Sequence, residues 1–528
     1  MWESVREARF QVSQKRHRKP ARGSAGARRA RKQLRKRKQR LDARLDKHNS
    51  PGTPALSGTN LHYEVAGRDV ATKAGGVGAI HQMVKALKLD KVIDQHVHVF
   101  KIHNPYSESD HILSMAFNAL AGGECLEDIE VLRQDEAYMD MLGAERIPDP
   151  TTAGDFLRRF DSAASIHTLM DSINFVRTRV WKHRRRMLGD RALIDMDGSV
   201  TPTLGEKKEG MAMSYKGEWG YHPLLISLGN TQEVMYLQNR AGSVASHENA
   251  AVLVDKAIAV CREAGFKEIM LRGDTDFSQT RHLDRWDADG VQFVFGYDAK
   301  KNLIAQAEGM PADAWSRLRR SGQVVTSGKE REKRENTKEA LVIANEYNNI
   351  KLLSEDIAEF DYQPHACSRP YRMVVVRKNL SVEKGETRLF DDVRYFFYIT
   401  NDSARRSDLI LQEAMERCNQ ENLIAQLKGG VHALHNPAHD LLSNWAYMVI
   451  VSLAWTLKAW FALMLPHVED REAMLKAKFR TFLNAVMLIP AQVVATGRRI
   501  VVRLLAYTAH ARLLIAAMQA IKPLRFST

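Results

Sequence analysis

The sequence predicts an α/β protein in which a catalytic domain is interrupted by a β-rich insertion. A helical region and a basic arm precede that domain. Between about residues 190 and 300, apolar runs of strand length alternate with helical patterns. The chain has 528 residues, of which 44% are hydrophobic, so it can bury a large core in two or three domains. Its formal net charge is +15, and most of that charge lies in residues 1–49, ahead of any apolar pattern.

Residues 1–60 are predicted to form a disordered basic arm followed by a linker. Lys and Arg cluster between residues 15 and 40, and a linker rich in Pro, Gly, Ser and Thr follows at 49–59. Such a charge run is an electrostatic footprint for a polyanion such as nucleic acid. The candidate DNA contacts in its densest part are Lys32, Arg35, Lys36 and Arg37. The alternative is a solvated tail without a partner.

Residues 61–185 are predicted to form a helical DNA-binding domain. Apolar residues recur at helical spacing in 80–89 and 111–120, and Asp149 followed by Pro150 is typical of a capped helix start. Small helical units of this kind often dock on DNA. A helical lid without DNA contact is the alternative.

Residues 186–300 carry the pattern of the first part of the catalytic core. Strands are expected at 192–197, 222–228, 233–238, 268–272 and 291–295, with helices at 246–265 and 278–289. Three strands followed by helix, strand, helix and strand is the order of an RNase H-like domain. Residues 301–403, which include strand-like runs at 371–377 and 394–400, are expected to be a β-rich insertion. Residues 404–528 then supply the second part of the core and C-terminal helices.

Composition limits the surroundings and partners of the protein. The four cysteines are scattered without a CxxC pair, which favours a reducing cytoplasm and argues against a zinc site. The run 441–465 is long enough to span a membrane, but Asn444 and Lys458 interrupt it, so we expect a core helix and no membrane partner. No phosphate-binding Gly-Lys-Ser/Thr loop is evident, so no nucleotide cofactor is expected.

Acidic residues stand at the ends of two predicted strands and on one helical segment. Asp195 and Asp197 are two apart on a strand and therefore share a face, although two exposed acids on an edge strand would give the same pattern. Asp274 follows the strand 268–272, where α/β sheets place ligands. Arg417, Glu421 and Lys428 are spaced to share a helix face, which by itself is equally typical of a surface ion-pair stripe. Carboxylates from two strands and one helix can hold two divalent metals for phosphodiester chemistry.

These pieces together resemble the DDE transposases of bacterial insertion sequences, in the branch with a DDE domain of group 1. The matching segments are Asp195-Met-Asp197-Gly-Ser199, Tyr215-Lys-Gly217, Gly220-Tyr-His-Pro223, Leu271-Arg-Gly-Asp274-Thr-Asp-Phe277 and the set Arg417, Glu421 and Lys428. The chain departs from the family pattern at Ala414, where Tyr is expected, at Asp276, where Gly is usual, and at Ser199, where Thr is usual. None of these changes removes a carboxylate of the motif.

The resemblance implies a cut-and-paste enzyme, because members with the Arg-Glu-Lys signature are similar to enzymes that pass through a hairpin end; the cleavage route stays open between a hairpin and another intermediate. The intact carboxylates favour an active copy. Asp197, Asp274 and Glu421 would hold two Mg²⁺ ions, for which Mn²⁺ would substitute, while Arg417 and Lys428 would clamp phosphates. Asp195 would assist or replace Asp197, and Asp197 is favoured as the first ligand. The partners would be double-stranded DNA, as terminal inverted repeats and target, and a second copy in a synaptic dimer on the cytoplasmic nucleoid.

Two other functions are consistent with these motifs. An RNase H-like nuclease that cuts without joining, or a catalytically silent transposase-derived DNA-binding protein, would carry similar motifs.

Trp219, Trp286 and Trp315 could stack on flipped bases, with Trp315 the best placed because it lies in the insertion, although core packing is favoured for all three.

Overall fold

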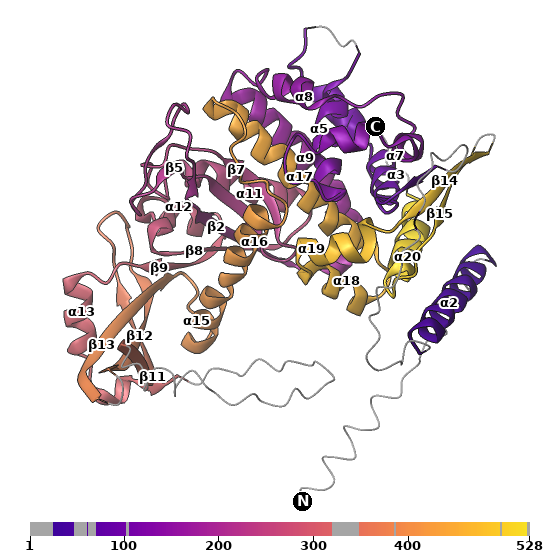
Figure 1. The fold of residues 1–528 in the computed structure, drawn as a ribbon. Helices are drawn as coiled ribbons and strands as arrows, with labels where there is room; N and C mark the ends of the chain where they lie inside the picture. The colour runs from indigo at the N-terminus through magenta and orange to yellow at the C-terminus, as the bar shows by residue number, and fades with distance from the viewer. Residues whose placement is uncertain are drawn as a thin grey trace, which may run out of the picture.

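A computed structural model describes residues 25–46, 61, 70–101, 105–318, 348–384, 387–496 and 499–524 of the chain. The fold is mixed α/β and is organised around one large mixed sheet (Figure 1). The predicted linker, the first part of the basic arm and the charged stretch around residue 330 lie outside the described residues.

The central sheet has nine strands in the order β10-β11-β12-β13-β9-β8-β2-β6-β7. Strand β2 pairs in parallel with β8, and β8 pairs in parallel with β9, whereas the other neighbours are antiparallel. The strands of the first part are β2 (Arg191–Gly198), β6 (Leu224–Leu228), β7 (Glu233–Gln238), β8 (Glu268–Gly273) and β9 (Gln292–Tyr297). All five predicted strands of this part are therefore confirmed.

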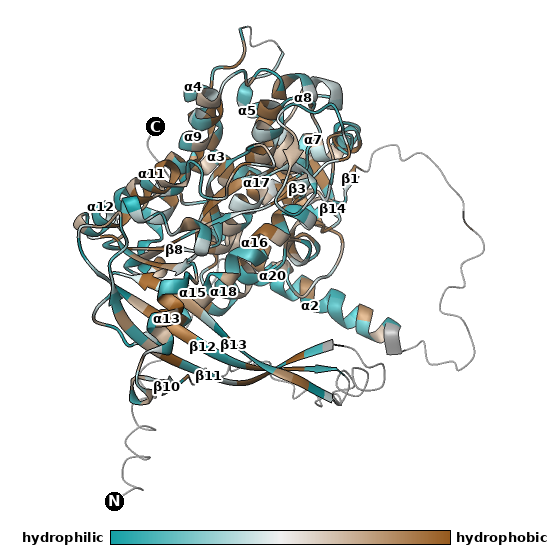
Figure 2. Ribbon diagram, turned by 90° about the vertical axis from the view of Figure 1, so that its left-hand side faces the viewer, coloured by the Kyte–Doolittle hydropathy of each residue, from teal (hydrophilic) through white to brown (hydrophobic). Residues whose placement is uncertain are grey.

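The strands of the insertion continue the same sheet. These strands are β10 (Ser316–Arg317), β11 (Asn348–Tyr362), β12 (Tyr371–Lys384) and β13 (Thr387–Thr400), after the helix α13 (Lys301–Glu308). Phe397–Thr400 of β13 pair with Val294–Tyr297 of β9, so the insertion is joined to the core by strand pairing. Beyond this junction the three long strands project from the body as a twisted arm (Figure 2).

The two faces of the sheet are covered by different helices. Ala192, Ile194 and Met196 of β2 point into the main core, on the side of α11 (Ala250–Glu263). Leu193 packs instead in a smaller cluster with Ile410 and Leu411 of α15 (Ser407–Glu416). Helix α16 (Cys418–Gly429) follows and contacts β2. The period of two in β2 thus sends its acidic residues toward α15 and α16.

Helix α17 (Leu441–Met464) is the central helix of the core. It packs against α5, α9, β7 and α18 (Val468–Lys476), and its apolar window is entirely buried. Among the described residues it is the one helix long and apolar enough to cross a membrane. Its Trp460 donates a hydrogen bond of 2.8 Å to Glu233, a fully buried carboxylate that also pairs with Arg177 and accepts from Trp181. Burial of a carboxylate is tolerated here because charged and polar donors surround it.

The helices before the sheet pack with the C-terminal part of the chain. They are α3 (Val77–Leu87), α4 (Leu89–His96), α5 (Glu108–Leu120), α6 (Ile129–Arg133), α7 (Glu136–Leu142), α8 (Pro150–Leu157), α9 (Ala163–His183) and α10 (Arg185–Leu188). Asp149 caps α8 by accepting from the Thr152 N–H, as predicted from the Asp-Pro start. The short strand β1 (Ala71–Thr72) joins a C-terminal hairpin of β14 (Ala491–Thr496) and β15 (Arg499–Leu504), beside α20 (Ala511–Ile521). This hairpin was not among the predicted elements.

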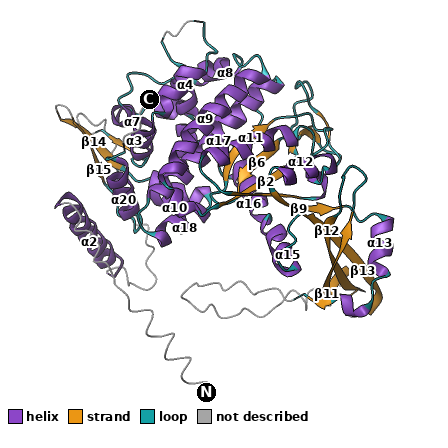
Figure 3. Ribbon diagram, turned by 180° about the vertical axis from the view of Figure 1, so that it is seen from behind, coloured by secondary structure: helices purple, strands orange, loops and turns teal. Residues whose placement is uncertain are grey.

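Part of the predicted disordered arm is helical, which corrects that prediction. Residues Ala25–Asp46 form α2, rich in Ala, Arg, Lys, Gln and Leu and free of Pro. These residue types have the strongest helix propensities, and only Gly26 opposes them. Figures 1 and 3 place α2 beside β15 and α20, on the opposite side of the molecule from the β-arm.

Candidate active site

Three carboxylates converge at one edge of the central sheet. Asp197 lies at the end of β2, Asp274 directly follows β8, and Glu421 lies in the first turn of α16. Because β2 and β8 are parallel neighbours, their carboxyl ends meet at the same edge. Helix α16 is fastened to this edge by the buried Gln420, whose Nε2 donates to the Leu225 carbonyl at 3.1 Å. The three predicted acidic residues therefore share one region of the fold.

Arg417 links two of these carboxylates. It stands at the break between α15 and α16, and its Nη1 lies 3.3 Å from Oδ2 of Asp197. Its Nη2 lies 3.8 Å from Oε1 of Glu421, one helical turn further on. The side chains of Arg417 and Asp197 are largely buried, whereas that of Glu421 is 62% exposed. The guanidinium is thus a cation placed among the acidic groups.

The carboxylates alter each other's protonation. Burial raises the pKa of Asp197 to about 7, Arg417 opposes this rise, and the charges of Asp274 and Glu421 add to it. Burial likewise raises the pKa of Asp274, with Asp276 and Glu421 adding and Arg417 opposing. Desolvation and like charge both disfavour the ionised form of a carboxyl group. Clustered carboxylates of this kind are stabilised by a nearby cation.

The chemistry of the three side chains fits a hard divalent metal. Oxygen donors from carboxylates are the ligands that Mg²⁺ and Mn²⁺ take in proteins, and a divalent cation would relieve the repulsion among Asp197, Asp274 and Glu421. Within the described ranges, however, no group of three or more His, Cys, Asp or Glu side chains is close enough to hold a metal ion. Arg417, rather than a common centre, is what Asp197 and Glu421 contact in this structure.

Asp195 faces the same way as Asp197 but has a different partner. Its Oδ1 and Oδ2 accept hydrogen bonds from Nε and Nη2 of Arg272, at 2.6 and 2.8 Å. Both side chains are only 2% exposed. Burial raises the pKa of Asp195, and the bidentate contact with Arg272 opposes the rise. Asp195 is therefore committed to an internal ion pair with Arg272, and Arg417 also opposes the rise in its pKa.

This ion pair belongs to a buried network that sequence reasoning did not find. Nη1 of Arg272 also lies 3.3 Å from Oε1 of Glu413 on α15. Glu413 pairs in turn with Arg191 at 2.7 Å and Arg405 at 2.9 Å. The network ties β2 and β8 to the helix that ends next to Arg417. Its signal in the sequence was Arg272, a charged residue that directly follows the apolar run Ile269–Leu271 of the strand.

Lys428 is anchored at the other end of α16. Its Nζ donates a 2.6 Å hydrogen bond to the Val200 carbonyl, in the segment that follows β2. Burial lowers the pKa of Lys428, the charge of Lys216 lowers it further, and Glu218 and Asp197 raise it. Lys428 is thus within electrostatic reach of Asp197.

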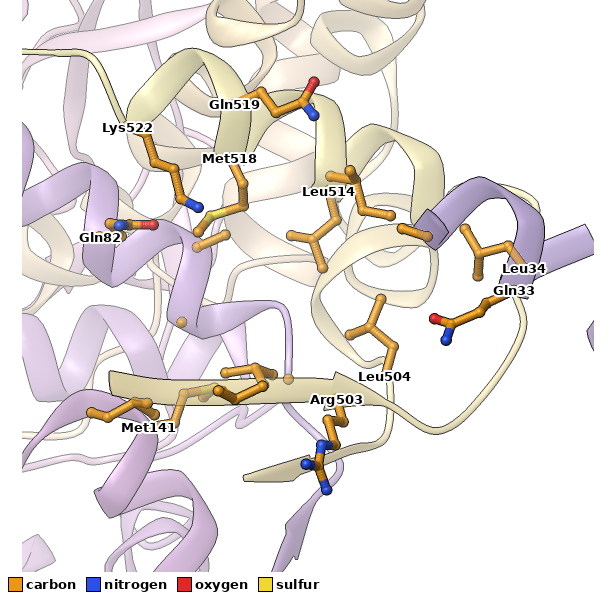
Figure 4. A pocket seen from close by; sticks show the side chains of 18 of the residues that line it. Gln33, Leu34, Gln82, Met141, Arg503, Leu504, Leu514, Met518, Gln519 and Lys522 are labelled. Atoms are coloured by element: carbon orange, nitrogen blue, oxygen red, sulfur yellow. The ribbon is translucent and has the colours of Figure 1, made fainter. Parts of the chain in front are cut away.

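The candidate DNA-contacting residues on α2 lie away from the three carboxylates. Lys32, Arg35 and Lys36 are exposed, and Arg37 donates to the carbonyl of Leu504 at the end of β15. A cavity of about 1650 Å³ lies between α2, α3, β15 and α20 (Figure 4). Its walls mix basic side chains of α2 with apolar ones such as Leu514 and Met518. The structure does not bring these basic residues to the carboxylates.

The comparisons with known proteins give the family. A family model described as the transposase DDE domain group 1 matches residues 53–526. No curated protein matches the chain. Among solved structures, the chain is similar to one described as a cryo-EM structure of the piggyBac transposase synaptic complex with hairpin DNA. The identity is 10%, the TM-score is 0.31, and the match covers 80% of this chain and 88% of that one. Because the family model spans most of the chain, the protein belongs to the DDE transposases of domain group 1, enzymes of metal-dependent DNA cleavage and strand transfer.

Proposed function

We propose that this chain is the transposase of an insertion sequence, which binds terminal inverted repeats and moves the element by cut-and-paste transfer through hairpin ends. The observation that carries the proposal is the convergence of Asp197, Asp274 and Glu421 from β2, the end of β8 and α16. Side chains far apart in the sequence gather at one sheet edge, beside two basic residues. The parallel pairing of β2, β8 and β9 next to antiparallel β6 and β7 supports an RNase H-like core.

In this proposal Asp197, Asp274 and Glu421 hold two Mg²⁺ ions, for which Mn²⁺ can substitute. When bound, the ions would activate the attacking oxygen and stabilise the leaving one. Arg417 compensates the carboxylate charge in the absence of metal and turns to a DNA phosphate near the scissile bond when DNA is bound. Lys428 holds a second phosphate from its place beside Val200. Asp195 has a positioning role through Arg272.

In this proposal the remaining regions bind DNA and form the homodimer. The helical region 61–185 and the basic residues Lys32, Arg35, Lys36 and Arg37 would contact double-stranded DNA, chiefly through its phosphates. Two copies would bring two element ends together as a homodimer, on the nucleoid in the cytoplasm. The division into a basic arm (1–60), helical domain (61–185), core (186–300 and 404–528) and insertion (301–403) is retained as part of the proposal.

The test is cleavage of a duplex that carries the element's own terminal repeat, with Mg²⁺ or with EDTA. We expect nicking at the repeat boundary to require Mg²⁺ and to be lost in Asp197→Ala, Asp274→Ala and Glu421→Ala. Binding in a gel-shift assay should survive in all three. Glu263→Ala, which removes an exposed carboxylate from α11, is the control and should cleave normally.

The products separate the competing functions. Joined products in a strand-transfer assay support a transposase, and cleavage without joining supports a nuclease. Tight binding of the repeat without any cleavage by the unmodified chain would support a silent DNA-binding protein. Normal cleavage by any of the three alanine variants would remove that residue from the proposed site.

A further inference from the structure

Exposed aromatic and apolar side chains gather on a small sheet next to the active site. The sheet consists of β3 (Thr201–Pro202), β5 and β4 (Ala212–Met213), and its middle strand β5 is Trp219–Tyr221. Met213 and Trp219 are cross-strand partners, so their side chains share a face. They are 43% and 52% exposed, and Tyr215 in the connecting turn is 75% exposed. Grouped exposed apolar side chains indicate a binding surface, whereas single ones do not.

The turn that carries Tyr215 is held rigidly. The Oγ of the buried Ser214 accepts from the backbone N–H groups of Lys216 and Glu218, at 3.3 and 3.2 Å. The Ser214 N–H donates to the Glu218 carbonyl at 2.8 Å, and the Gly217 N–H donates to the Ser214 carbonyl at 2.9 Å. Gly217 has a φ of +75°, which a side chain would disfavour. Tyr215 and Lys216 are therefore fixed at the tip of a closed turn, and binding would not have to order this backbone.

Contacts connect this turn to the catalytic carboxylates. The ring of Tyr215 lies 6.0 Å from the ring of His222. His222 is buried, and its Nε2 lies 2.6 Å from the position that a Cβ on Gly198 would occupy. Gly198 directly follows Asp197 in β2. The same turn also lies near Lys428. The charges of Lys216 and Glu218 shift the pKa of Lys428, and the charge of Asp197 shifts it too. The turn therefore borders the place where DNA must present its scissile bond.

We propose that Tyr215 and Trp219 form a stacking site for the bases of an unpaired DNA strand beside the active site, with Lys216 contacting its backbone. The inference rests on the proposed function and adds a binding site to it. Bases of any sequence offer a π-face to an aromatic ring, and the neighbouring Lys216 and Lys428 match a polyanion. Trp286 and Trp315 do not offer such a surface. Trp286 is buried with its Nε1 bonded to Asp255. Trp315 is half-buried against the main core, with Arg377 at 4.2 Å from its ring, whereas Tyr215 is exposed and has Lys216 at 5.5 Å.

The test uses the full chain silenced by Asp274→Ala, so that binding is measured without cleavage. The probes are a fluorescein-labelled oligothymidylate and a blunt duplex of equal length, followed by fluorescence anisotropy. Adding Tyr215→Ala or Trp219→Ala removes one base stack and should weaken oligothymidylate binding by roughly 5- to 150-fold. Blunt-duplex binding should change far less. Tyr215→Phe and Trp219→Phe keep a ring and should bind like the parent.

A control variant and a photocrosslinking experiment test whether the effect is specific to Tyr215 and Trp219. Phe390→Ala removes another exposed aromatic, 58% exposed at the far end of the β-arm, and should leave oligothymidylate binding unchanged. Photolysis of an oligonucleotide containing 5-iododeoxyuridine should attach it to Tyr215 or Trp219, identified by mass spectrometry. Unchanged oligothymidylate affinity in both alanine variants, or crosslinks only elsewhere, would overturn the proposal.

Two further outcomes also decide against it. An equal loss of affinity for the oligothymidylate and for the blunt duplex would show that Tyr215 and Trp219 support DNA binding in general, without a preference for unpaired bases. A shift from dimer to monomer in sedimentation of the alanine variants would show that the patch binds a second copy of the chain. Because cleavage plays no part in these measurements, they are separate from the test of the proposed function. A chain that cleaves normally but shows no dependence on Tyr215 or Trp219 would contradict only the stacking site.

Discussion

Among single residues, Asp195 and Asp197 lie two apart on one strand but have different partners. Both point to the same face of β2, as their spacing predicted. Asp195 stands opposite Arg272 in the parallel register with β8, and there it forms a bidentate ion pair. Asp197, two residues on, lies in the field of Asp274, Glu421 and Arg417. The resemblance favoured Asp197 as the first ligand, but strand periodicity alone could not distinguish the two aspartates, because the difference depends on the register between β2 and β8.

The two aspartates should therefore differ in their effect on stability. Asp195→Ala leaves Arg272 buried without its bidentate partner, and we expect a loss of roughly 3–5 kcal/mol in the free energy of unfolding. Asp197→Ala removes a desolvated carboxyl that other carboxylates repel, and should leave stability unchanged or raised. Urea unfolding of both variants and the parent, in EDTA, measures the difference. The assignment would be contradicted by a stable Asp195→Ala variant together with an unstable Asp197→Ala variant.

At the scale of elements, strands were predicted better than the shorter helices and the tail. Strands such as β7 are uninterrupted apolar runs, and the observed bounds Glu233–Gln238 coincide with the predicted ones. The helix predicted at 278–289 is reduced to α12 (Leu283–Ala288), after two short 3-10 turns. There the side chain of Asp274 accepts from the Asp276 N–H, and Gln279 donates to the His247 carbonyl, so side chains compete with helical bonding. The hairpin β14–β15 escaped prediction because its basic, partly apolar sequence lacks a clear period.

Helix α17 carries a buried lysine whose protonation should affect stability. Lys458 is 1% exposed, and its Nζ lies 3.9 Å from the ring centroid of Trp455 and 2.8 Å from the Leu475 carbonyl. Burial lowers the pKa of Lys458 to about 7, from 10.5 in an unfolded chain. Between these values the unfolded chain binds the extra proton. This group therefore favours folding increasingly as pH rises through that window, by roughly 1.4 kcal/mol per pH unit at most.

The variant Lys458→Met removes that titration and keeps an apolar stem. We expect it to be more stable than the parent below pH 7, with the advantage shrinking as pH rises toward 10. Urea unfolding at pH 6, 8 and 10 gives the comparison, and Lys182→Met, at an exposed surface pair, is the control. A difference between Lys458→Met and the parent that does not vary with pH would show that Lys458 is not a buried titrating group.

At the scale of the whole molecule, the insertion and the catalytic core form one continuous sheet. The sequence indicated β-rich character in residues 301–403, but not that β13 would pair with β9. That pairing joins segments about a hundred residues apart, and no local pattern encodes it. The gathering of Asp197, Asp274 and Glu421 is also a long-range property. It was predicted through resemblance to a family, because strand periodicity places each residue on its own element but not beside the others.

The distribution of charge leads to a prediction about DNA affinity. Lys32, Arg35 and Lys36 are exposed on α2, away from the carboxylates. Replacing all three by Gln should weaken binding of any duplex and reduce the slope of log affinity against log salt by up to about 0.9 per lost phosphate contact. Titrations of an unrelated duplex at several salt concentrations measure this slope. An unchanged slope would show that α2 does not contact DNA.

In the proposed function, β2, the end of β8 and α16 together form one metal centre. Fe²⁺ with ascorbate, added to the chain without DNA, tests it directly, because a bound iron ion generates radicals that cut the nearby backbone. We expect cuts close to Asp197, Asp274 and Glu421 in the same sample, suppressed by excess Mg²⁺ and lost in Asp274→Ala. Cuts confined to other segments, or cuts at these three that persist in Asp274→Ala, would contradict it.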